Sequence, residues 1–213
     1  MNLRNVILVA LVSATAASAQ YSPFMTRYAA NTDPESYIII TNTGSYGAPL
    51  LGPGFGAAAG NICVNVYAFD PAEELISCCS CLVTPDQTVN LGVNRDLLSK
   101  TLTGVIPTSV TIKLLSTLAG SDGTGSSCTN SAATVTTGLL ARGAMAAWGT
   151  TLHTTPTAGT YATTETAFTP STLGAGELAS ITGRCASIIG NASGFGICSS
   201  CRAGALGSTK SSQ

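Results

Sequence analysis

Residues 62–83 decide the fold of this chain. They read Ile-Cys-Val-Asn-Val-Tyr-Ala-Phe at 62–69, Asp-Pro-Ala-Glu-Glu at 70–74 and Leu-Ile-Ser-Cys-Cys-Ser-Cys-Leu-Val at 75–83. Side chains alternate between the two faces of a strand, and 62–69 places its aliphatic residues at every second position. Asp70-Pro71 ends this strand because proline breaks a sheet ladder and constrains the residue before it. Two strands joined by a short polar turn predict a hairpin or meander.

Other short β-rich segments lie on both sides of this hairpin, separated by Gly and Pro. We expect strands at 36–43, 88–93, 109–116 and 135–148, and a single helical turn at 94–98. The Ala and Leu content of 135–148 also permits a helix, but its Thr and Gly flanks favour a strand. Residues 20–35 are polar and 44–60 are most simply a loop. The segment 149–172 holds 11 Thr in 24 residues. It is either an exposed, glycosylatable stretch or one or two strands, and we favour strands because Thr favours sheets.

The clearest helix comes late in the chain. Its apolar residues recur at +3, +7, +10 and +11 from the first, which is the spacing of one helical face. They are Leu178, Ile181, Cys185, Ile188 and Ile189. Gly190-Asn191 ends the helix, which we place near 176–190. The sequence therefore predicts a mainly β, β-sandwich-like single domain over 20–205, with one C-terminal α-helix packed on it, and a flexible tail at 206–213.

The first 19 residues have the pattern of a secretory signal peptide. Arg4 is the positive charge, Val6 to Val12 is the apolar run, and Ala17-Ser18-Ala19 is the cleavage site. The apolar run is far shorter than the ~20 residues that span a membrane. We therefore expect a secreted protein, extracellular or on the cell surface, with the periplasm as a further option and no membrane span after cleavage.

Cysteine is the main chemical signal. An even number in an exported chain is typical of a disulfide framework. If 75–83 is a strand, Cys79 and Cys81 share one face and Cys78 points away, so Cys78 and Cys79 need different partners. Bonds to the C-terminal pair would tie the tail to the sheet, and Cys185 could pin the helix. The eight residues are Cys63, Cys78, Cys79, Cys81, Cys128, Cys185, Cys198 and Cys201.

Two other uses of these cysteines compete with structural disulfides. Cys78-x2-Cys81 and Cys198-x2-Cys201 have the local spacing of a Cys₄ zinc site. Their wide separation, the extra cysteines and the oxidising compartment argue against it. Thiol–disulfide exchange through either pair normally needs a helix N-terminus or a cationic neighbour. Arg202 adjoins Cys201, but no βαβ pattern surrounds it. We expect structural disulfides, no metal and no cofactor.

The charge content narrows the function classes. Of 213 residues, 9 are Lys or Arg and 10 are Asp or Glu, for a net charge of −1. This leaves no basic surface for nucleic acid. A single His, His153, leaves few His-based catalytic relays, and we expect it to be exposed. The 45% apolar content argues against disorder.

The densest acidic cluster is Asp70, Glu73 and Glu74. Three carboxylates in five residues could bind Ca²⁺ or supply the two carboxylates of a glycan hydrolase, and the simpler interpretation is a solvated turn.

Three aromatic residues, Tyr67, Phe69 and Trp148, could form a sugar-stacking platform, although core packing explains them equally well. Asn191-Ala192-Ser193 matches an N-glycosylation acceptor.

Two stretches resemble a known group of proteins. One is Ile62 to Asp70 running into Cys78-Cys79-Ser80-Cys81, and the other is Glu177-Leu178-Ala179 through Cys185 to Gly194–Cys201. Together they resemble uncharacterised exported Cys-rich proteins of acidobacterial type. The resemblance implies a bacterial source and makes the two Cys clusters parts of one design. That group has no assigned activity, so it implies no catalytic residue.

Three functions follow as hypotheses. The first is a non-catalytic structural or binding protein, secreted or at the cell surface, whose partner could be a surface polysaccharide. The second is an exported hydrolase acting on polysaccharide through Asp70, Glu73 and Glu74. The third is a self-assembling surface subunit, because low charge leaves little repulsion between copies and exposed β edges can pair.

Overall fold

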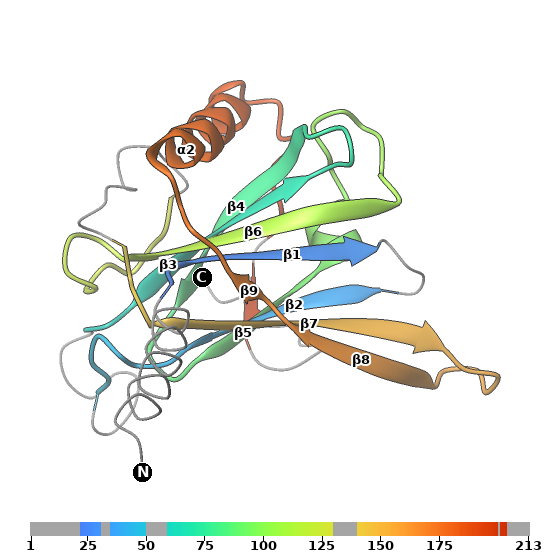
Figure 1. Cartoon of the computed structure of the whole chain (residues 1–213), viewed down its shortest axis with the longest axis horizontal. Coiled ribbons are helices and arrows are strands. Elements are labelled where there is room, and N and C mark those ends of the chain that lie inside the picture. The colour runs from blue at the N-terminus through green and yellow to red at the C-terminus, as the bar shows by residue number, and fades with distance from the viewer. Residues whose placement is uncertain (1–21, 31–34, 50–58, 130–139, 200, 204–213) are drawn as a thin grey trace, which may run out of the picture.

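Two five-stranded antiparallel sheets face each other, and one helix lies across the outside of one of them (Figure 1). The computed structural model describes residues 22–30, 35–49, 59–129, 140–199 and 201–203. The predicted signal peptide and the predicted tail at 206–213 lie outside these residues. Sheet A has the order β4-β3-β6-β1-β9, and sheet B has the order β10-β5-β2-β7-β8. The prediction of a mainly β sandwich with one C-terminal helix is confirmed.

The elements of sheet A are β1 (Phe24–Ala30), β3 (Ile62–Phe69), β4 (Leu75–Val83), β6 (Ser109–Leu118) and β9 (Thr169–Pro170). Those of sheet B are β2 (Ser36–Asn42), β5 (Thr88–Gly92), β7 (Met145–Thr154), β8 (Tyr161–Ala167) and β10 (Arg202–Ala203). A single π-helical turn, η2 (Val93–Leu97), follows β5, and the helix is α2 (Ala175–Gly190).

The hairpin of β3 and β4 forms over the predicted residues. All eight residues of β3 are buried, because one face packs between the sheets and the other lies under α2. Val64 and Val66 belong to the core between the sheets, whereas Tyr67 and Phe69 belong to the core under the helix. Both faces of β3 are therefore covered, and this explains why its aromatic residues alternate with aliphatic ones.

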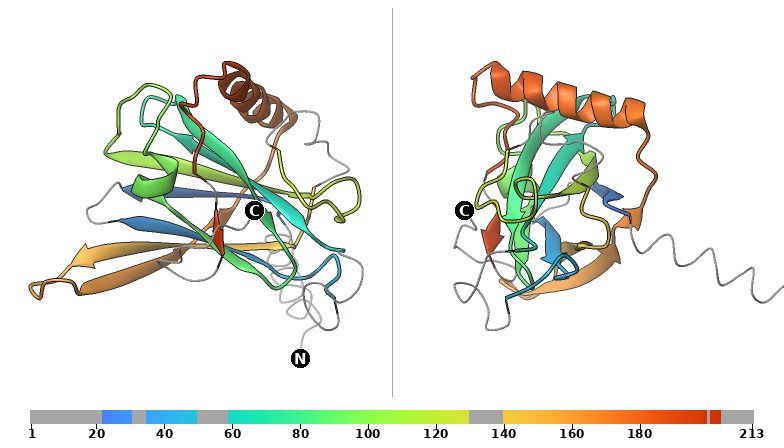
Figure 2. Two further views of the ribbon diagram at one scale, coloured as in Figure 1. Left: turned by 180° about the vertical axis from the view of Figure 1, so that it is seen from behind. Right: turned by 90° about the vertical axis from the view of Figure 1, so that its left-hand side faces the viewer.

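Helix α2 lies across the outer face of sheet A, as the two further views show (Figure 2). Ile181, Cys185 and Ile188 point into the core beneath it. Glu177, in the first turn of the helix, forms an ion pair with Lys113 of β6. Ile189, which the spacing places on the same face, is 41% exposed and marks the margin of the buried stripe.

Both open sides of the sandwich are crossed by the chain. On one side, the Cys78 N–H donates to the Gly196 carbonyl and the Cys198 N–H donates to the Cys78 carbonyl. The C-terminal segment, by which we mean residues 194–199 and 201–203, therefore follows the edge of β4. The same segment then enters sheet B, where β10 pairs with β5. On the other side, the chain passes from β8 in sheet B through Phe168 to β9 in sheet A.

Three expectations need correction. Strand β1 lies inside residues 20–35, which were interpreted only as polar. Arg27 occupies an inward position between Met25 and Ala29, so the alternation of apolar and polar residues expected of a strand is interrupted there. The strand expected at 135–148 begins only at Met145, after a turn at 141–144, and its part up to 139 lies outside the described residues. The turn expected at 94–98 begins at Val93. The Thr-rich segment forms strands, but β8 is exposed throughout.

Candidate functional site

An open cleft of about 750 Å³ lies between α2 and the β3–β4 turn. We call it the α2 cleft. Its apolar lining is Leu75, Leu102 and Ile188, and its polar lining includes Glu73, Glu74, Arg184 and Asn191. A smaller hollow of about 410 Å³ adjoins it and shares Glu73 and Arg184. The cleft therefore offers two carboxylates and one guanidinium above an apolar floor.

Asp70 serves the turn rather than the cleft. Its Oδ1 accepts the backbone N–H groups of Ala72 and Glu74, each at 2.9 Å. Such a contact replaces backbone hydrogen bonds in a tight turn. Of the three acidic residues predicted as hydrolase candidates, Asp70 thus has a structural role in holding the other two in place.

Glu73 and Glu74 are exposed on the rim of the α2 cleft. Glu73 has a positive φ of 66°, a backbone region that residues other than Gly and Asn rarely occupy. Arg184 Nη1 donates to the Glu73 carbonyl at 3.1 Å, which fixes this turn against the helix. Within the described part of the chain, the two carboxylates have no hydrogen-bond or ion-pair partner. A polar ligand would find them accessible, but no contact holds them at the fixed separation that acid–base hydrolysis requires.

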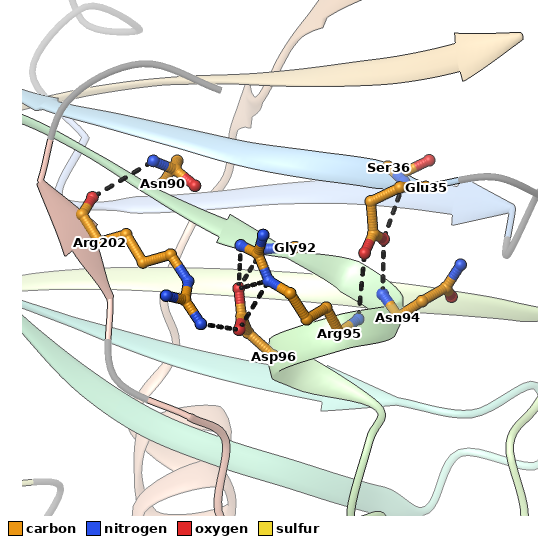
Figure 3. A network of polar contacts seen from close by, with 8 residues as sticks. All are labelled: Glu35, Ser36, Asn90, Gly92, Asn94, Arg95, Asp96 and Arg202. Carbon is orange, nitrogen blue, oxygen red and sulfur yellow. Dashed lines mark hydrogen bonds and ion pairs between the residues drawn. The ribbon is translucent and has the colours of Figure 1, made fainter. Parts of the chain in front are cut away.

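A densely hydrogen-bonded polar cluster lies elsewhere, around η2 (Figure 3). Asp96 is 1% exposed and forms ion pairs with Arg95, at 2.6 Å, and Arg202, at 3.3 Å. Its Oδ2 also accepts the Gly92 N–H at 2.8 Å. Burial alone would raise the pKa of Asp96, but the hydrogen bonds from Arg95, Gly92 and Arg202 outweigh it and hold the pKa below its ordinary value. The hydrogen bond to Asp96 in turn raises the pKa of Arg95.

Glu35 holds the other end of the same turn (Figure 3). Its carboxylate accepts the N–H of Asn94 at 2.7 Å, of Arg95 at 3.1 Å and of Ser36 at 3.0 Å. The first N–H groups of a helical turn have no partner within it, so this carboxylate replaces a capping residue. Glu35 and Asp96 together anchor η2 to β2 and to the C-terminal segment, because Arg202 belongs to β10.

Arg27 lies between the two sheets. Its Nη2 contacts Thr151 Oγ1 of β7 at 3.4 Å, and its guanidinium carbon lies 6.0 Å from the centre of the Phe168 ring. A Cβ on Gly149 would lie 0.9 Å from Arg27 Nη1, so the glycine makes room for the guanidinium. Burial lowers the pKa of Arg27. The Arg27 side chain thus fills the space that the missing side chain of Gly149 leaves between the sheets.

The other predicted candidates are dispersed. Tyr67 is fully buried and Phe69 is 9% exposed, so both belong to the core under α2, and burial raises the pKa of Tyr67. Trp148, 40% exposed, lies on the outer face of sheet B. The three aromatic residues therefore do not form one platform. His153 is exposed, and its Nε2 lies 3.0 Å from Thr164 Oγ1 of β8. Asn191, of the N-glycosylation pattern, lines the α2 cleft.

All eight cysteines are paired, and the disulfide framework is confirmed. The bonds are Cys63–Cys128, Cys78–Cys185, Cys79–Cys198 and Cys81–Cys201, with Cα–Cα distances of 5.5 to 6.0 Å. Cys78 and Cys79 have different partners, as the alternation predicts. Both Cys-x2-Cys pairs are thus used in disulfides, and no group of three metal-ligating side chains occurs among the described residues.

The comparisons add no relative. No family model matches this sequence, and neither the curated proteins nor the solved structures contain a match. The resemblance to exported acidobacterial proteins therefore stays a prediction. Among the described residues, no helix has the length and apolarity needed to cross a membrane.

Glu35, Asp96 and Arg27 were not predicted from the sequence as site residues. They are buried or half-buried charged residues that form hydrogen bonds or ion pairs within the fold. One signal was available: Arg95-Asp96 lies in the turn just after the predicted strand 88–93, and charged residues are almost never buried unless they are paired. Arg27 between Met25 and Ala29 was a similar signal, since an inward Arg in a β pattern indicates a polar contact across the sheets. These residues organise the fold rather than a reaction centre.

Proposed function

We propose that this chain is a non-catalytic structural or binding protein that acts outside the cell or at its surface. The observation that carries the proposal is the disulfide framework. It links β4 to α2 and to the C-terminal segment, and it links β3 to the loop that contains Cys128. Such dense cross-linking is typical of proteins from oxidising compartments, because reductants in the cytosol keep thiols reduced. The predicted signal peptide at 1–19 agrees with this location.

The use of charge supports the same proposal. The buried carboxylates, Glu35 and Asp96, are fully occupied by backbone N–H groups and arginines. Asp70 is occupied by its own turn. Catalytic acids and bases need an approachable atom in a pocket that perturbs them, and these three carboxylates have instead been used to hold loops. A bacterial source and a surface polysaccharide as ligand are part of the proposal.

The test is to express the full chain with export and to analyse the secreted product. We expect an N-terminus at Gln20, four disulfides and no turnover on a panel of polysaccharides, glycosides, esters and peptides. Co-sedimentation with insoluble cell-wall polysaccharides would then identify a binding partner. A product that keeps Met1 and eight free thiols would contradict the extracellular role.

The α2 cleft favours one second candidate, polysaccharide hydrolysis, because it presents Glu73 and Glu74 beside Arg184. Turnover of any glycan by the unaltered protein, lost in Glu73→Gln or Glu74→Gln without a change in melting temperature, would establish it. Lys100→Gln, an exposed change outside the cleft lining, is the matched control.

A further inference from the structure

The four edge strands of the two sheets are protected to very different degrees. The edge of β4 is followed by the C-terminal segment, through hydrogen bonds on both sides of Cys78. Strands β9 and β10 have two residues each, and β9 contains Pro170. Strand β8 has seven residues, all exposed, and it pairs only with β7 among the described strands. Natural sheets normally shorten, cover or charge such an edge.

The direction of the free backbone groups on β8 follows from its pairing. The Phe168 N–H donates to the Ala147 carbonyl at 3.0 Å, and Trp148 lies opposite Ala167. In an antiparallel ladder, hydrogen-bonded and non-hydrogen-bonded pairs alternate, so residues 162, 164 and 166 bond to β7. The N–H and C=O groups of residues 161, 163, 165 and 167 therefore point away from β7, toward the open edge.

Strand β8 also lacks the usual features that prevent pairing. It reads Tyr-Ala-Thr-Thr-Glu-Thr-Ala, with no Pro, no Lys and a single charge at Glu165. Its register against β7 runs without a bulge from end to end. Thr and Tyr favour strands, although none of these residues is buried in the domain. The hairpin of β7 and β8 extends past the ends of the neighbouring strands, which leaves the edge accessible (Figure 1).

We propose that β8 pairs antiparallel with β8 of a second copy of this chain and joins the two B sheets into one. With Thr164 on the twofold axis, Tyr161 lies opposite Ala167 and Thr163 lies opposite Glu165. Pairing of the outward-facing residues in this register forms about eight backbone hydrogen bonds.

The strand complements itself in this register. Glu165 lies opposite the neutral hydroxyl of Thr163 in the other copy, so no like charges oppose each other. Tyr161, the largest side chain of the strand, lies opposite Ala167, one of the smallest. This self-complementarity indicates a second copy in preference to an unrelated strand. The contact is small for a protein interface, so the association is weak, reversible and concentration-dependent.

This inference rests on the structural role proposed above and names its partner. The two are separable by experiment: a monomeric, disulfide-bonded and catalytically inactive protein would overturn β8 pairing and leave the non-catalytic role standing. Catalytic turnover by a dimer would do the reverse.

The experiment compares three variants of the oxidised, full-length secreted protein by sedimentation velocity across concentration. Thr163→Lys places a cation opposite Glu165 twice in the dimer, and Thr163→Glu places two carboxylates opposite two carboxylates. Thr108→Glu, an exposed threonine in the loop before β6, is the control. We expect Thr163→Lys to tighten and Thr163→Glu to weaken the dimer by roughly 3- to 30-fold, with both effects reduced by salt. The control should match the unaltered protein.

Amide exchange measured by NMR at low and high protein concentration locates the contact. Residues 161, 163, 165 and 167 should gain protection as concentration rises, while residues 162, 164 and 166 are protected at both. A monomer at every concentration, for the unaltered protein and Thr163→Lys alike, would overturn the proposal. So would association that both Thr163 variants leave unchanged, or concentration-dependent protection confined to another part of the chain, which would indicate a different partner surface.

Discussion

Cys78 and Cys79 are neighbours in β4, yet their disulfides lie on opposite faces of sheet A. Cys78 bonds to Cys185 of α2 on the outer face, and Cys79 bonds to Cys198 of the C-terminal segment toward the inner face. One strand thereby holds both the helix above the sheet and the segment that closes the sandwich beside it. Three of the four disulfides therefore start from β4.

The first prediction concerns that connectivity. Non-reducing peptide mapping should find the four pairs described above, and the oxidised protein should be about 8 Da lighter than its reduced form, from two hydrogens per disulfide. Replacing Cys78 and Cys185 together by Ala should lower the free energy of unfolding by about 3 kcal/mol in the chain-entropy model. The bond joins residues 107 apart, but the neighbouring Cys79–Cys198 bond remains and leaves only the stretch 185–198 to be closed. Chemical denaturation measures the loss.

The same pair can be compared with Cys63 and Cys128, which are 65 residues apart. The double Ala variant of that pair should cost more, about 4 kcal/mol, because no other disulfide shortens its loop. It should leave the helix content measured by circular dichroism unchanged. Equal loss of helix signal in both variants would contradict the assignment of Cys185 to helix docking.

The second prediction concerns the charge of Asp96. Asp96→Asn keeps the shape of the side chain but removes the charge that two arginines share, and it should destabilise the protein by about 2–3 kcal/mol at neutral pH. The value lies below the 3–5 kcal/mol of a fully buried pair because both arginines are partly exposed. Urea denaturation measures it, with the exposed Asp86→Asn as control.

The pH dependence of this effect has a definite sign. The pKa of Asp96 is lowered in the folded state, so its ionised form contributes stability above the ordinary carboxyl pKa of about 4. That contribution is lost as the pH falls through the lowered folded-state pKa. The difference in stability between the unaltered protein and Asp96→Asn should therefore be constant near neutral pH and shrink below about pH 4. A difference that grows on acidification would contradict this account.

The third prediction concerns Glu35. Glu35→Ala removes the acceptor of three backbone N–H groups, two of which begin η2, and should cost about 1–3 kcal/mol in unfolding free energy. Amide exchange at Asn94 and Arg95, in η2, should accelerate more than exchange in the strands of sheet B. Glu74→Ala, which removes an exposed carboxylate, should change neither quantity.

The fourth prediction couples Gly149 to Arg27. A methyl group on Gly149 overlaps the guanidinium, so Gly149→Ala should destabilise the protein by about 1–3 kcal/mol. In the background of Arg27→Ala the same change should cost much less, because the space is then open. A double-mutant cycle in urea measures this coupling, and additive effects of the two changes would show that the residues do not compete for space.

Regular patterning made much of this fold predictable from sequence. The alternation in 62–69 and the β-rich run 75–83 predicted two strands to the residue, because the polar turn 70–74, with Pro71, separates them. The helix was predictable from Ile181, Cys185 and Ile188 because its buried stripe is apolar. Strand β1 was not predictable in this way, since Arg27 occupies a core position that only a contact with the facing sheet can justify.

The candidate site was less predictable for a related reason. Asp70, Glu73 and Glu74 are close in sequence, but hydrogen bonding commits Asp70 to the turn and leaves the other two to the α2 cleft. Glu35 and Asp96 are 61 positions apart and meet around one turn of backbone. Partners that come together only through sheet packing leave no local spacing from which to predict them.

The order in which the cysteines occur along the chain has a consequence for biosynthesis. Three of the four disulfides need a residue at 185, 198 or 201, while only Cys63–Cys128 can close earlier. A nascent or truncated chain that stops before Cys185 would leave the three cysteines of β4 without their native partners and open to wrong pairing. Formation of all four native disulfides therefore requires that synthesis has passed residue 201.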